Sequence, residues 1–464
     1  MKILLTHGYF LAEDPREQQI MRPYPPLGIL YISAYLEQYG FPNHIYDSTF
    51  KTLENLKGYL LQQNPDLIGI YTNLMTKLNV LKIIQFIKND PTLQKMKIIL
   101  GGPEVRNHKE NFLQHGADII VFGEGENSML EIVKLYSGNN HMDLHDIQGI
   151  AFLNAEGNML INPERMLIGD IDQLPFPNRS KIDLQQYFDV WKKKHGISML
   201  NVNTMRGCPY SCKWCSRAVY GSSYRRRHPK LVADEIQWMK AHYQFDMIWF
   251  VDDVFTINHR WLREFADEIQ ERKMVIPYEI ITRADRINEE VVRLLKKSGC
   301  FRVWIGAESG SQKIIDAMDR RVKVTQVRSM IQLVRSYGME AGTFIMLGYP
   351  GEEESDIKET LHHLKYSNPD QYTITVAYPI KGTPLYTEVE NLFVKELPWE
   401  TSTDRDIDFK RKYNRKYYQH AINWIHFEML FHKRKKNSSG WLLKLKAWKA
   451  RSRMWHEKLR SPAN

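Results

Sequence analysis

The sequence predicts an α/β protein with two parallel sheets, one after the other along the chain, and a helical, basic extension. Short apolar runs alternate with amphipathic segments between residues 1 and 140, and the same alternation returns between residues 200 and 381. Strands that alternate with helices of this length form parallel sheets. Residues 410–464 contain 16 Lys and Arg residues and two acids, whereas the rest of the chain has 48 bases and 52 acids. The net charge of +10 therefore belongs to the extension.

The composition places the chain among ordinary globular proteins. It has 464 residues, of which 43% are hydrophobic and 25% are charged. This length suits two domains plus an extension better than one compact domain. The apolar runs are strand-length, far below the roughly 20 residues of a membrane span. The N-terminus lacks the apolar core and cleavage site of a signal peptide, so we expect a cytoplasmic protein.

The first strand–helix series predicts a doubly wound sheet. The expected strands cover residues 2–6, 44–47, 67–71, 98–100 and 119–122, and the expected helices cover residues 27–39, 53–63, 80–88 and 127–136. Ligands of such sheets bind in the loops at the carboxyl ends of the strands. Residues suited to a ligand are therefore expected in those loops.

Three of these loops are rich in glycine or proline. Two follow strands, at residues 101–104 and 123–126, and residues 25–28 open the first helix. Glycine at a strand end lets the backbone approach a large ligand closely. Tight strand-to-helix turns require the same glycines, so both interpretations stand at this point.

A second α/β series follows a boundary region. Residues 149–163 are typical of a small hairpin, and the Pro-rich segment 174–177 marks the boundary. Six further strands are expected at residues 200–204, 247–251, 279–282, 302–305, 343–346 and 371–377. Six βα units indicate a partial (β/α)6 barrel that is open on one side. The predicted parts are residues 1–140, a hairpin and linker at 141–194, the barrel at 195–390, and the helical extension at 391–464.

The four cysteines are too few for a disulfide framework and indicate metal chemistry instead. Cys208, Cys212 and Cys215 follow an expected strand at the spacing C-x3-C-x2-C, where barrel enzymes hold their active sites. Three thiolates can ligate three irons of a [4Fe–4S] cluster and leave the fourth iron open. A structural zinc site requires four ligands. Cys300 stands alone and is expected to be a small buried side chain. Zinc, or no metal at all, is the alternative.

This cysteine spacing, with Trp214 before the last cysteine, resembles the signature of the radical S-adenosylmethionine (SAM) superfamily over roughly residues 195–390. The resemblance implies that the amine and carboxylate of SAM chelate the open iron. One electron then cleaves a carbon–sulfur bond and gives a 5′-deoxyadenosyl radical, which abstracts hydrogen from a small-molecule substrate. An electron donor such as flavodoxin or ferredoxin is implied too. The strand-end residues that match the family as SAM contacts are Asp252, Asp253, Arg283, Glu308, Ser309, Gly348 and Tyr378.

A Rossmann-like domain before such a barrel resembles the cobalamin-binding subgroup of that superfamily. The positions that match as cobalamin contacts are Pro25, Pro26, Gly28, Thr72, Gly101, Gly102, Gly123, Glu124, Gly125 and Glu126. The D-x-H-x-x-G motif, whose histidine ligates cobalt, is absent. His7 is therefore expected to be a polar loop residue without a ligand role. A nucleotide ligand, or no ligand, is the alternative for this domain.

Within the subgroup, residues 226–236 and 250–258 resemble the anaerobic magnesium-protoporphyrin IX monomethyl ester cyclase type. The first hypothesis is accordingly oxidative or cyclising chemistry on a large, tetrapyrrole-like substrate. The second is methyl transfer to carbon with cobalamin as the methyl carrier. Methylthiolation needs a second cluster, and no cysteine precedes Cys208, so this reaction is rejected. The sequence does not separate the first two.

The extension combines basic residues with Trp424, Trp441, Trp448 and Trp455. We expect an amphipathic cap that packs on the barrel with its tryptophans inward and its Lys and Arg side chains in water. Contact with RNA or with an anionic membrane surface is the alternative. Attraction of carboxylate-bearing substrates is a third use.

Overall fold

The computed structural model of the chain describes residues 1–138, 142–434 and 440–460. Its internal contacts divide it into two units. Unit 1 comprises Met1–Pro209, Ser216–Met247 and Leu397–Thr403, and unit 2 comprises Tyr210–Cys215, Ile248–Glu396 and Asp404–Asn464. Both units contain parallel strands and helices, so the predicted α/β class is confirmed.

Unit 1 is built on a seven-stranded sheet with the order β2-β1-β3-β4-β5-β6-β7. Its strands are β1 (Ile3–His7), β2 (His44–Tyr46), β3 (Leu67–Tyr71), β4 (Lys97–Gly101), β5 (Ile119–Val121), β6 (Ile150–Leu153) and β7 (Met159–Ile161). The first five strands are parallel, and β6 and β7 extend the sheet as an antiparallel hairpin. The strand order reverses between β1 and β3, which is where doubly wound sheets bind ligands.

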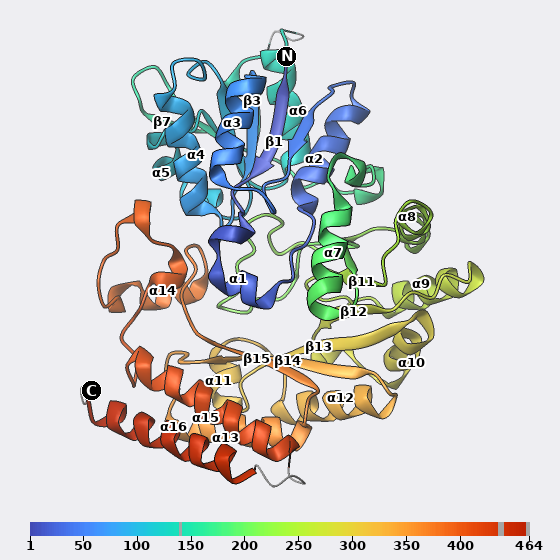
Figure 1. Cartoon of the computed structure of the whole chain (residues 1–464), viewed down its shortest axis with the longest axis vertical. Coiled ribbons are helices and arrows are strands. Elements are labelled where there is room, and N and C mark those ends of the chain that lie inside the picture. The colour runs from blue at the N-terminus through green and yellow to red at the C-terminus, as the bar shows by residue number, and fades with distance from the viewer. Residues whose placement is uncertain (139–141, 435–439, 461–464) are drawn as a thin grey trace. The chain divides into compact units, whose positions relative to one another are not determined.

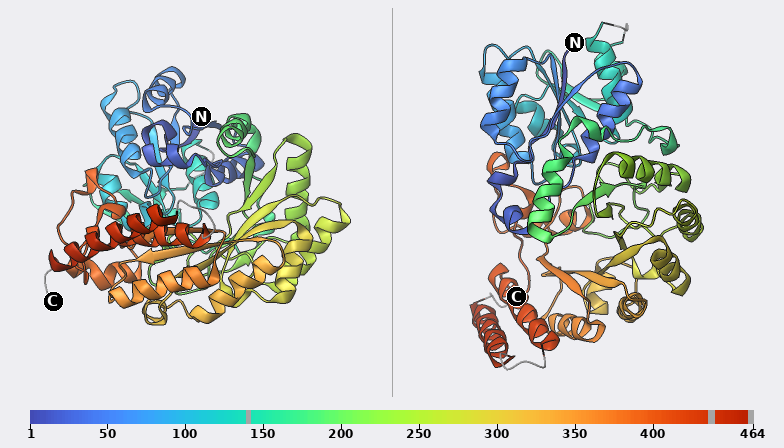
Figure 2. Two further views of the ribbon diagram at one scale, coloured as in Figure 1. Left: turned by 60° about the horizontal axis from the view of Figure 1, so that its bottom comes forward. Right: turned by 45° about the vertical axis from the view of Figure 1, so that its right-hand side comes forward.

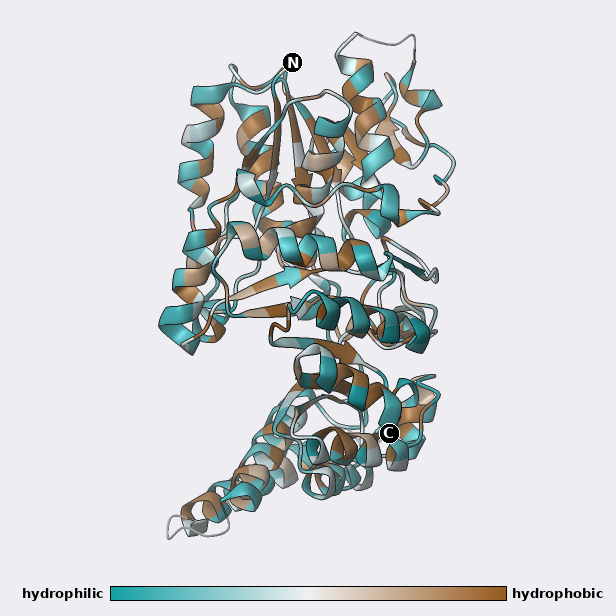
Figure 3. Ribbon diagram, turned by 90° about the vertical axis from the view of Figure 1, so that its right-hand side faces the viewer, coloured by the Kyte–Doolittle hydropathy of each residue, from teal (hydrophilic) through white to brown (hydrophobic). Residues whose placement is uncertain are grey.

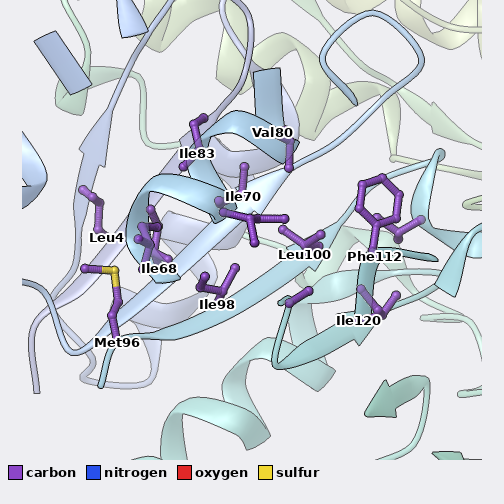
Figure 4. Packing of buried hydrophobic residues seen from close by; sticks show 14 of the residues in the cluster. Leu4, Ile68, Ile70, Val80, Ile83, Met96, Ile98, Leu100, Phe112 and Ile120 are labelled. Carbon is purple, nitrogen blue, oxygen red and sulfur yellow. The ribbon is translucent and has the colours of Figure 1, made fainter. Parts of the chain in front are cut away.

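Helices cover both faces of this sheet, and the strands supply an apolar core to each face (Figure 1). The helices are α2 (Leu27–Gln38) and α6 (Gly125–Tyr136) on one face and α3 (Leu53–Gln63), α4 (Lys77–Asn89) and α5 (Lys109–Gln114) on the other. Because strand side chains alternate between faces, Leu4, Ile68 and Leu100 lie in the core beneath α4 (Figure 4). Their neighbours Leu5 and Ile99 lie in the opposite core with α2 and α6.

Local sequence signals place the helix ends of unit 1. The Thr52 hydroxyl accepts a hydrogen bond from the backbone N–H of Asn55, and the Asn55 side chain accepts one from the backbone N–H of Thr52, so a capping box starts α3. Asp183 caps α7 (Leu184–His195) through the N–H groups of Gln185 and Gln186. The remaining elements of unit 1 are α1 (Pro15–Ile20), β8 (Met199–Val202), β9 (Met205–Arg206), β10 (Arg225–Arg226) and α8 (Pro229–His242).

The second sheet has the strand order β15-β14-β13-β12-β11-β8. Its later strands are β11 (Met247–Phe250), β12 (Tyr278–Thr282), β13 (Cys300–Glu308), β14 (Glu340–Leu347) and β15 (Gln371–Val376). β11 to β15 are parallel and pair in consecutive order. The helices that alternate with them are α9 (His259–Glu271), α10 (Glu289–Ser298), α11 (Gln312–Ala317), α12 (Val324–Ser336), α13 (Glu354–Ser367) and α14 (Pro384–Val389). The consecutive strand order is that of an open barrel.

The C-terminal extension consists of two long helices that lie side by side, α15 (Arg415–Lys433) and α16 (Gly440–Arg460) (Figures 1 and 2). Tyr417, Tyr418 and Trp424 of α15 are buried. The expectation that the tail tryptophans face inward therefore holds for Trp424. It is wrong for three others on α16, which are exposed, because the buried face of that helix consists of smaller or flexible side chains: Ala447, Ala450 and Met454.

No helix in the described ranges is both long enough and apolar enough to cross a membrane. Hydrophobic residues are concentrated in the strands of both sheets, whereas polar and apolar residues alternate along the C-terminal helices (Figure 3). The strands thus form the interior, and the extension keeps an amphipathic character along its length.

Candidate functional site

Unit 1 contains a cavity of about 270 Å³ at the strand ends nearest the reversal in strand order. Leu5, Gly69, Ile99 and Val121 line it from β1, β3, β4 and β5. Helices α2 and α6 supply further apolar side chains, and Val219 and Tyr220 also line the cavity. Ligand pockets commonly measure about 300–1,000 Å³. The cavity therefore fits a flat, apolar part of a large molecule better than the whole of one.

Seven of the ten residues expected to contact cobalamin line this cavity. They are Gly28, Gly101, Gly102, Gly123, Glu124, Gly125 and Glu126. The other three lie elsewhere: the carbonyl of Pro25 accepts a hydrogen bond from Asn201, Pro26 precedes α2, and Thr72 is fully buried. Among these positions, Gly102 has a structural requirement. Its φ is +108°, and a Cβ atom there would lie 2.4 Å from the carbonyl oxygen of Thr72.

The two glutamates of the cavity wall belong to a buried ion cluster. Arg206 donates from Nη1 to Glu124 at 2.8 Å and from Nη2 to Glu126 at 2.5 Å. Arg225 donates from Nη1 to the other oxygen of Glu124 at 2.7 Å. Burial alone would raise the pKa of Glu126, but the charge of Arg206 offsets this and holds the pKa below its ordinary value. These carboxylates are thus engaged by arginines rather than left to bind a ligand.

The same arginine connects the cavity wall to the cysteine segment. Arg206 is two residues before Cys208, and only Gly207 separates them. Gly207 has φ +86°, and a Cβ atom there would lie 2.4 Å from the carbonyl oxygen of Ser223. The start of the cysteine segment is therefore fixed by an ion cluster on one side and by a glycine turn on the other.

His7 lies at the end of β1 with both ring nitrogens in use. The backbone N–H of Tyr9 donates to Nδ1 at 3.2 Å, and Nε2 lies 3.0 Å from Asp47. With Nδ1 as the acceptor, Nε2 carries the proton and donates to the carboxylate. The Asp47 carboxylate also accepts from the hydroxyl of Tyr187 at 2.7 Å. His7 is 3% exposed, so its ring has no nitrogen available to a metal.

The three clustered cysteines occupy a loop and differ in exposure. Cys208 is half-buried, Cys212 is buried and Cys215 is exposed, and they form no disulfide. Among the described residues, no group of three His, Cys, Asp or Glu side chains converges as it would around a single metal ion. In a cubane each cysteine binds a different iron, so the three sulfurs need not converge on one point. Cys300, by contrast, is buried at the start of β13, where burial raises the pKa of its thiol.

Two buried guanidinium groups flank the sulfur of Cys212. Arg320 donates from Nη1 at 3.5 Å and Arg283 from Nη1 at 3.7 Å. Arg283 also donates to the carbonyl of Arg320 at 2.7 Å and lies over the ring of Tyr210 at 3.8 Å. The Nε of Arg320 is buried and finds no hydrogen-bond partner among the described residues. Positive charge of this kind stabilises a thiolate, so the donor set fits an anionic cluster bound through Cys212.

Glu308 has a backbone conformation that non-glycine residues rarely adopt. It ends β13 with φ +65°, beside an irregularity in the pairing with β14. A non-glycine residue in this conformation costs on the order of 1–3 kcal/mol and is typical of functional sites. Its carboxylate is 3.9 Å from Arg320. Burial raises the pKa of Glu308, although Arg320 and Arg283 act in the opposite direction. Glu308 and Arg320 thus connect a strained strand end to Cys212.

The remaining expected SAM contacts follow their strands without converging on one group. After β11, Asp252 is buried and Asp253 is exposed. The hydroxyl of Ser309 lies 3.3 Å from that of Thr360 and accepts from the N–H of Ser311. Tyr378 is half-buried just after β15. The structure therefore gives Ser309 a packing role that its motif position did not indicate.

Gly348 lies after β14 and is fixed by one nearby and one distant side chain. Its N–H donates to the Glu352 carboxylate at 2.5 Å, and its carbonyl accepts from Nε of Arg411 at 2.9 Å. Arg411 also donates from Nη2 to the carbonyl of Ala377 at 2.7 Å, after β15. Burial raises the pKa of Glu352 to about 8. The extension thus contributes a side chain to the ends of two barrel strands.

Sequence reasoning missed Arg206, Arg225, Arg320 and Arg411. Arg206 directly precedes Gly207 and Cys208, and this position next to the cysteine segment was the one signal in the sequence that could have indicated its importance. Arg320 is 108 residues from Cys212 and Arg411 is 63 residues from Gly348, so no spacing in the sequence relates them.

Two family models match the chain. The first, described as the radical SAM superfamily, matches residues 202–364. The second, described as the B12 binding domain, matches residues 20–133. The first range includes the cysteine segment, and the second includes β3, β4 and β5 of the cavity wall but not β1.

Individual proteins give consistent similarities. The chain is 26% identical to an uncharacterized methyltransferase of Pyrococcus horikoshii over 89% of this chain and 88% of that protein. It is 25% identical to the anaerobic magnesium-protoporphyrin IX monomethyl ester cyclase of Rubrivivax gelatinosus over 84% of this chain and 70% of that protein. Among solved structures, the radical SAM methyltransferase TsrM of Kitasatospora setae, with cobalamin and a [4Fe–4S] cluster bound, superposes with a TM-score of 0.70 at 16% identity. That match covers 84% of this chain and 74% of the other, and it shows a shared fold.

Proposed function

Because the chain belongs to the radical SAM superfamily and carries a B12-binding domain, we propose that it transfers a methyl group to a carbon atom of a small organic substrate. It is a radical SAM enzyme, and its cofactors are a [4Fe–4S] cluster, SAM and cobalamin. The main support for methyl transfer is the extent of similarity to relatives. The P. horikoshii methyltransferase matches this chain over 88% of its own length, whereas the cyclase matches over 70%. When bound, these cofactors supply an electron, a methyl donor and a methyl carrier.

We assign the cluster to Cys208, Cys212 and Cys215. The support is their spacing and the two guanidinium groups on the sulfur of Cys212. Arg283 and Arg320 balance the negative charge of thiolates and sulfides in a buried place. An external one-electron donor must reduce the cluster, and flavodoxin or ferredoxin has the required chemistry.

We assign SAM to the strand ends of unit 2, with Glu308 as the principal contact. Its strained backbone and buried carboxyl group fit a side chain held ready for a ligand. Asp252, Asp253 and Tyr378 are further proposed contacts from neighbouring strand ends. In this role the chain orients the ligand and excludes water from it.

We assign an apolar part of cobalamin to the cavity of unit 1. The cavity is lined by side chains such as Leu5, Ile99 and Val121, and it offers glycine backbone at Gly101 and Gly123 for close approach. Since both nitrogens of the His7 ring are in use, the chain would bind cobalamin without a histidine ligand from β1.

The experiment measures how SAM is consumed by the anaerobically reconstituted enzyme with cobalamin and a chemical reductant. We expect 5′-deoxyadenosine together with a burst of S-adenosylhomocysteine, since the second product reports loss of the SAM methyl group. Cys208→Ala, Cys212→Ala and Cys215→Ala each abolish iron and sulfide uptake and both products. Cys300→Ala is the matched control and retains them. Formation of 5′-deoxyadenosine without S-adenosylhomocysteine would contradict methyl transfer.

Oxidative cyclisation of a large, tetrapyrrole-like substrate is the second candidate. The similarity to the R. gelatinosus cyclase over 84% of this chain favours it. The same assay separates the candidates, because cyclisation consumes SAM without removing its methyl group. A product whose mass rises by one methyl group supports the first proposal and excludes the second.

A further inference from the structure

Helix α16 has a buried face and an apolar face that nothing in the described structure covers. Ala447, Ala450 and Met454 are buried against α15. The exposed side chains include five large apolar residues whose exposed fractions lie between 52% and 70%: Trp441, Leu445, Trp448, Trp455 and Leu459. Isolated exposed apolar residues are common, but a contiguous set indicates an interaction surface.

Helix geometry gathers these five residues into one stripe. Their spacings of four, three, seven and four residues repeat the period of an α-helix, and Ser452 occupies the remaining position of the stripe. At about 100° per residue, the stripe lies roughly opposite the face that packs on α15. We call these five residues and Ser452 the α16 stripe.

Basic side chains border the α16 stripe on both sides. Residues 440–460 contain seven Lys and Arg residues and one acid, Glu457. On one border, Lys444 is paired with Glu428 at 3.0 Å and Lys458 with Glu354 at 2.8 Å. On the other border stand Lys446, Lys449 and Arg453, for which the described residues provide no ion pair. This second border leaves positive charge available to an external partner.

The partner must bury large apolar groups and neutralise positive charge at the same time. An anionic lipid surface does both, because Trp and Leu insert between headgroups while Lys and Arg bind them. A nucleic acid neutralises the charge but gives leucines no apolar environment. A second copy of the chain would bring two basic borders together. We propose that the α16 stripe docks the protein on anionic membranes, with α16 lying in the plane of the surface.

This docking is independent of the proposed reaction and brings the enzyme to a place where lipid-dissolved molecules are concentrated. The test is flotation of the full-length protein with phosphatidylcholine vesicles that contain or lack phosphatidylglycerol. We expect flotation only with phosphatidylglycerol and its loss at high salt, since counterions screen the attraction. The triple variant Lys446→Glu, Lys449→Glu, Arg453→Glu should bind on the order of 100-fold more weakly.

Two further variants separate charge from apolar contact. A second triple variant combines Trp441→Ser, Trp448→Ser and Trp455→Ser. It should also fail to float with the vesicles, because the side chains that insert into the lipid are removed. The charge-matched control Lys192→Glu, Lys193→Glu, Lys194→Glu alters exposed residues at the end of α7 and should float as the parent protein does. All substituted side chains are exposed, so circular dichroism should show unchanged folding.

Three outcomes would overturn the proposal. One is equal flotation of the parent and both α16 variants. Another is binding of a single-stranded RNA, lost in the basic variant, by a protein that ignores vesicles. The third is a dimer in sedimentation velocity that dissociates in the tryptophan variant while vesicles remain unbound.

Discussion

Arg320 donates a hydrogen bond from Nη1 to the sulfur of Cys212 across 3.5 Å, and both side chains are buried. If Cys212 ligates the cluster, this cation stabilises the more negative, reduced state. Arg320→Met should therefore shift the cluster midpoint potential to a more negative value. Anaerobic redox titration followed by electron paramagnetic resonance measures the shift.

The neighbouring Arg321 is the control for this prediction. Its guanidinium pairs with Asp319 on the surface and donates no hydrogen bond to Cys212 in the described structure. Arg321→Met should leave the potential nearly unchanged. A potential that moves equally in both variants would show that Arg320 does not act on the cluster directly.

Substitution of Gly102 tests the backbone of the cavity wall. Gly102→Ala places Cβ 2.4 Å from the carbonyl oxygen of Thr72 in a backbone conformation with φ +108°. We expect a loss of about 1–3 kcal/mol in the free energy of unfolding, with weaker cobalamin binding. Gly58→Ala is the control, since Gly58 lies within α3 with open space around it. That change should raise stability by about 0.5–1 kcal/mol, and denaturant unfolding measures both.

The buried carboxyl group of Glu352 makes stability depend on pH. Burial raises its pKa from 4.5 in the unfolded chain to about 8. Between these values the folded state holds a proton that the unfolded state releases, so stability falls as pH rises, by up to about 1.4 kcal/mol per unit. Glu352→Gln should flatten this slope and stabilise the protein most at pH 8 and above, where the parent carries the full cost of the buried charge.

Thermal unfolding between pH 5 and 9 checks the slope. Glu359→Gln, on the exposed side of α13, removes the same charge and should leave the slope unchanged. An unaltered slope in Glu352→Gln would assign the pH dependence to other groups.

Removal of Arg206 should destabilise unit 1 strongly. Arg206→Met leaves the buried carboxylate of Glu126 without its main cation and leaves Glu124 with Arg225 alone, which costs about 3–5 kcal/mol. In the parent protein, the lowered pKa of Glu126 adds stability above its unfolded value of 4.5, and this stability is lost as pH falls through the folded pKa. Chemical denaturation at neutral and acidic pH measures both effects. Arg16→Met, on the surface of α1, should change neither.

The sequence predicted the strands well because their signal is local. All eleven expected strands occur within a few residues of their predicted bounds, since apolar runs flanked by glycine report the burial of a strand directly. The short helix α5 was missed, because its six residues contain too few apolar positions to establish a period. The fold class therefore followed from pattern alone.

The site was only partly predictable. Glycine loops located the cavity because strand ends always meet at one edge of a parallel sheet. The arginines on Glu124 and Cys212 come from 82 and 108 residues away, and no periodicity links such partners. The outward tryptophans of α16 were mispredicted for a related reason: hydrophobicity alone does not tell which of two faces meets the protein.

Arg411 makes the extension inseparable from the barrel. Its guanidinium caps the carbonyls of Gly348 and Ala377, at the ends of β14 and β15. A chain shortened at Glu400 would lack Arg411 and leave both carbonyls without this donor. A loss of activity or binding in that chain would then reflect misfolding of the barrel rather than the removal of a binding surface on the extension. A chimera that combines the barrel of one relative with the C-terminal helices of another should accordingly have its junction after Arg411. Each barrel then retains the arginine that donates to the carbonyls at the ends of its last two strands.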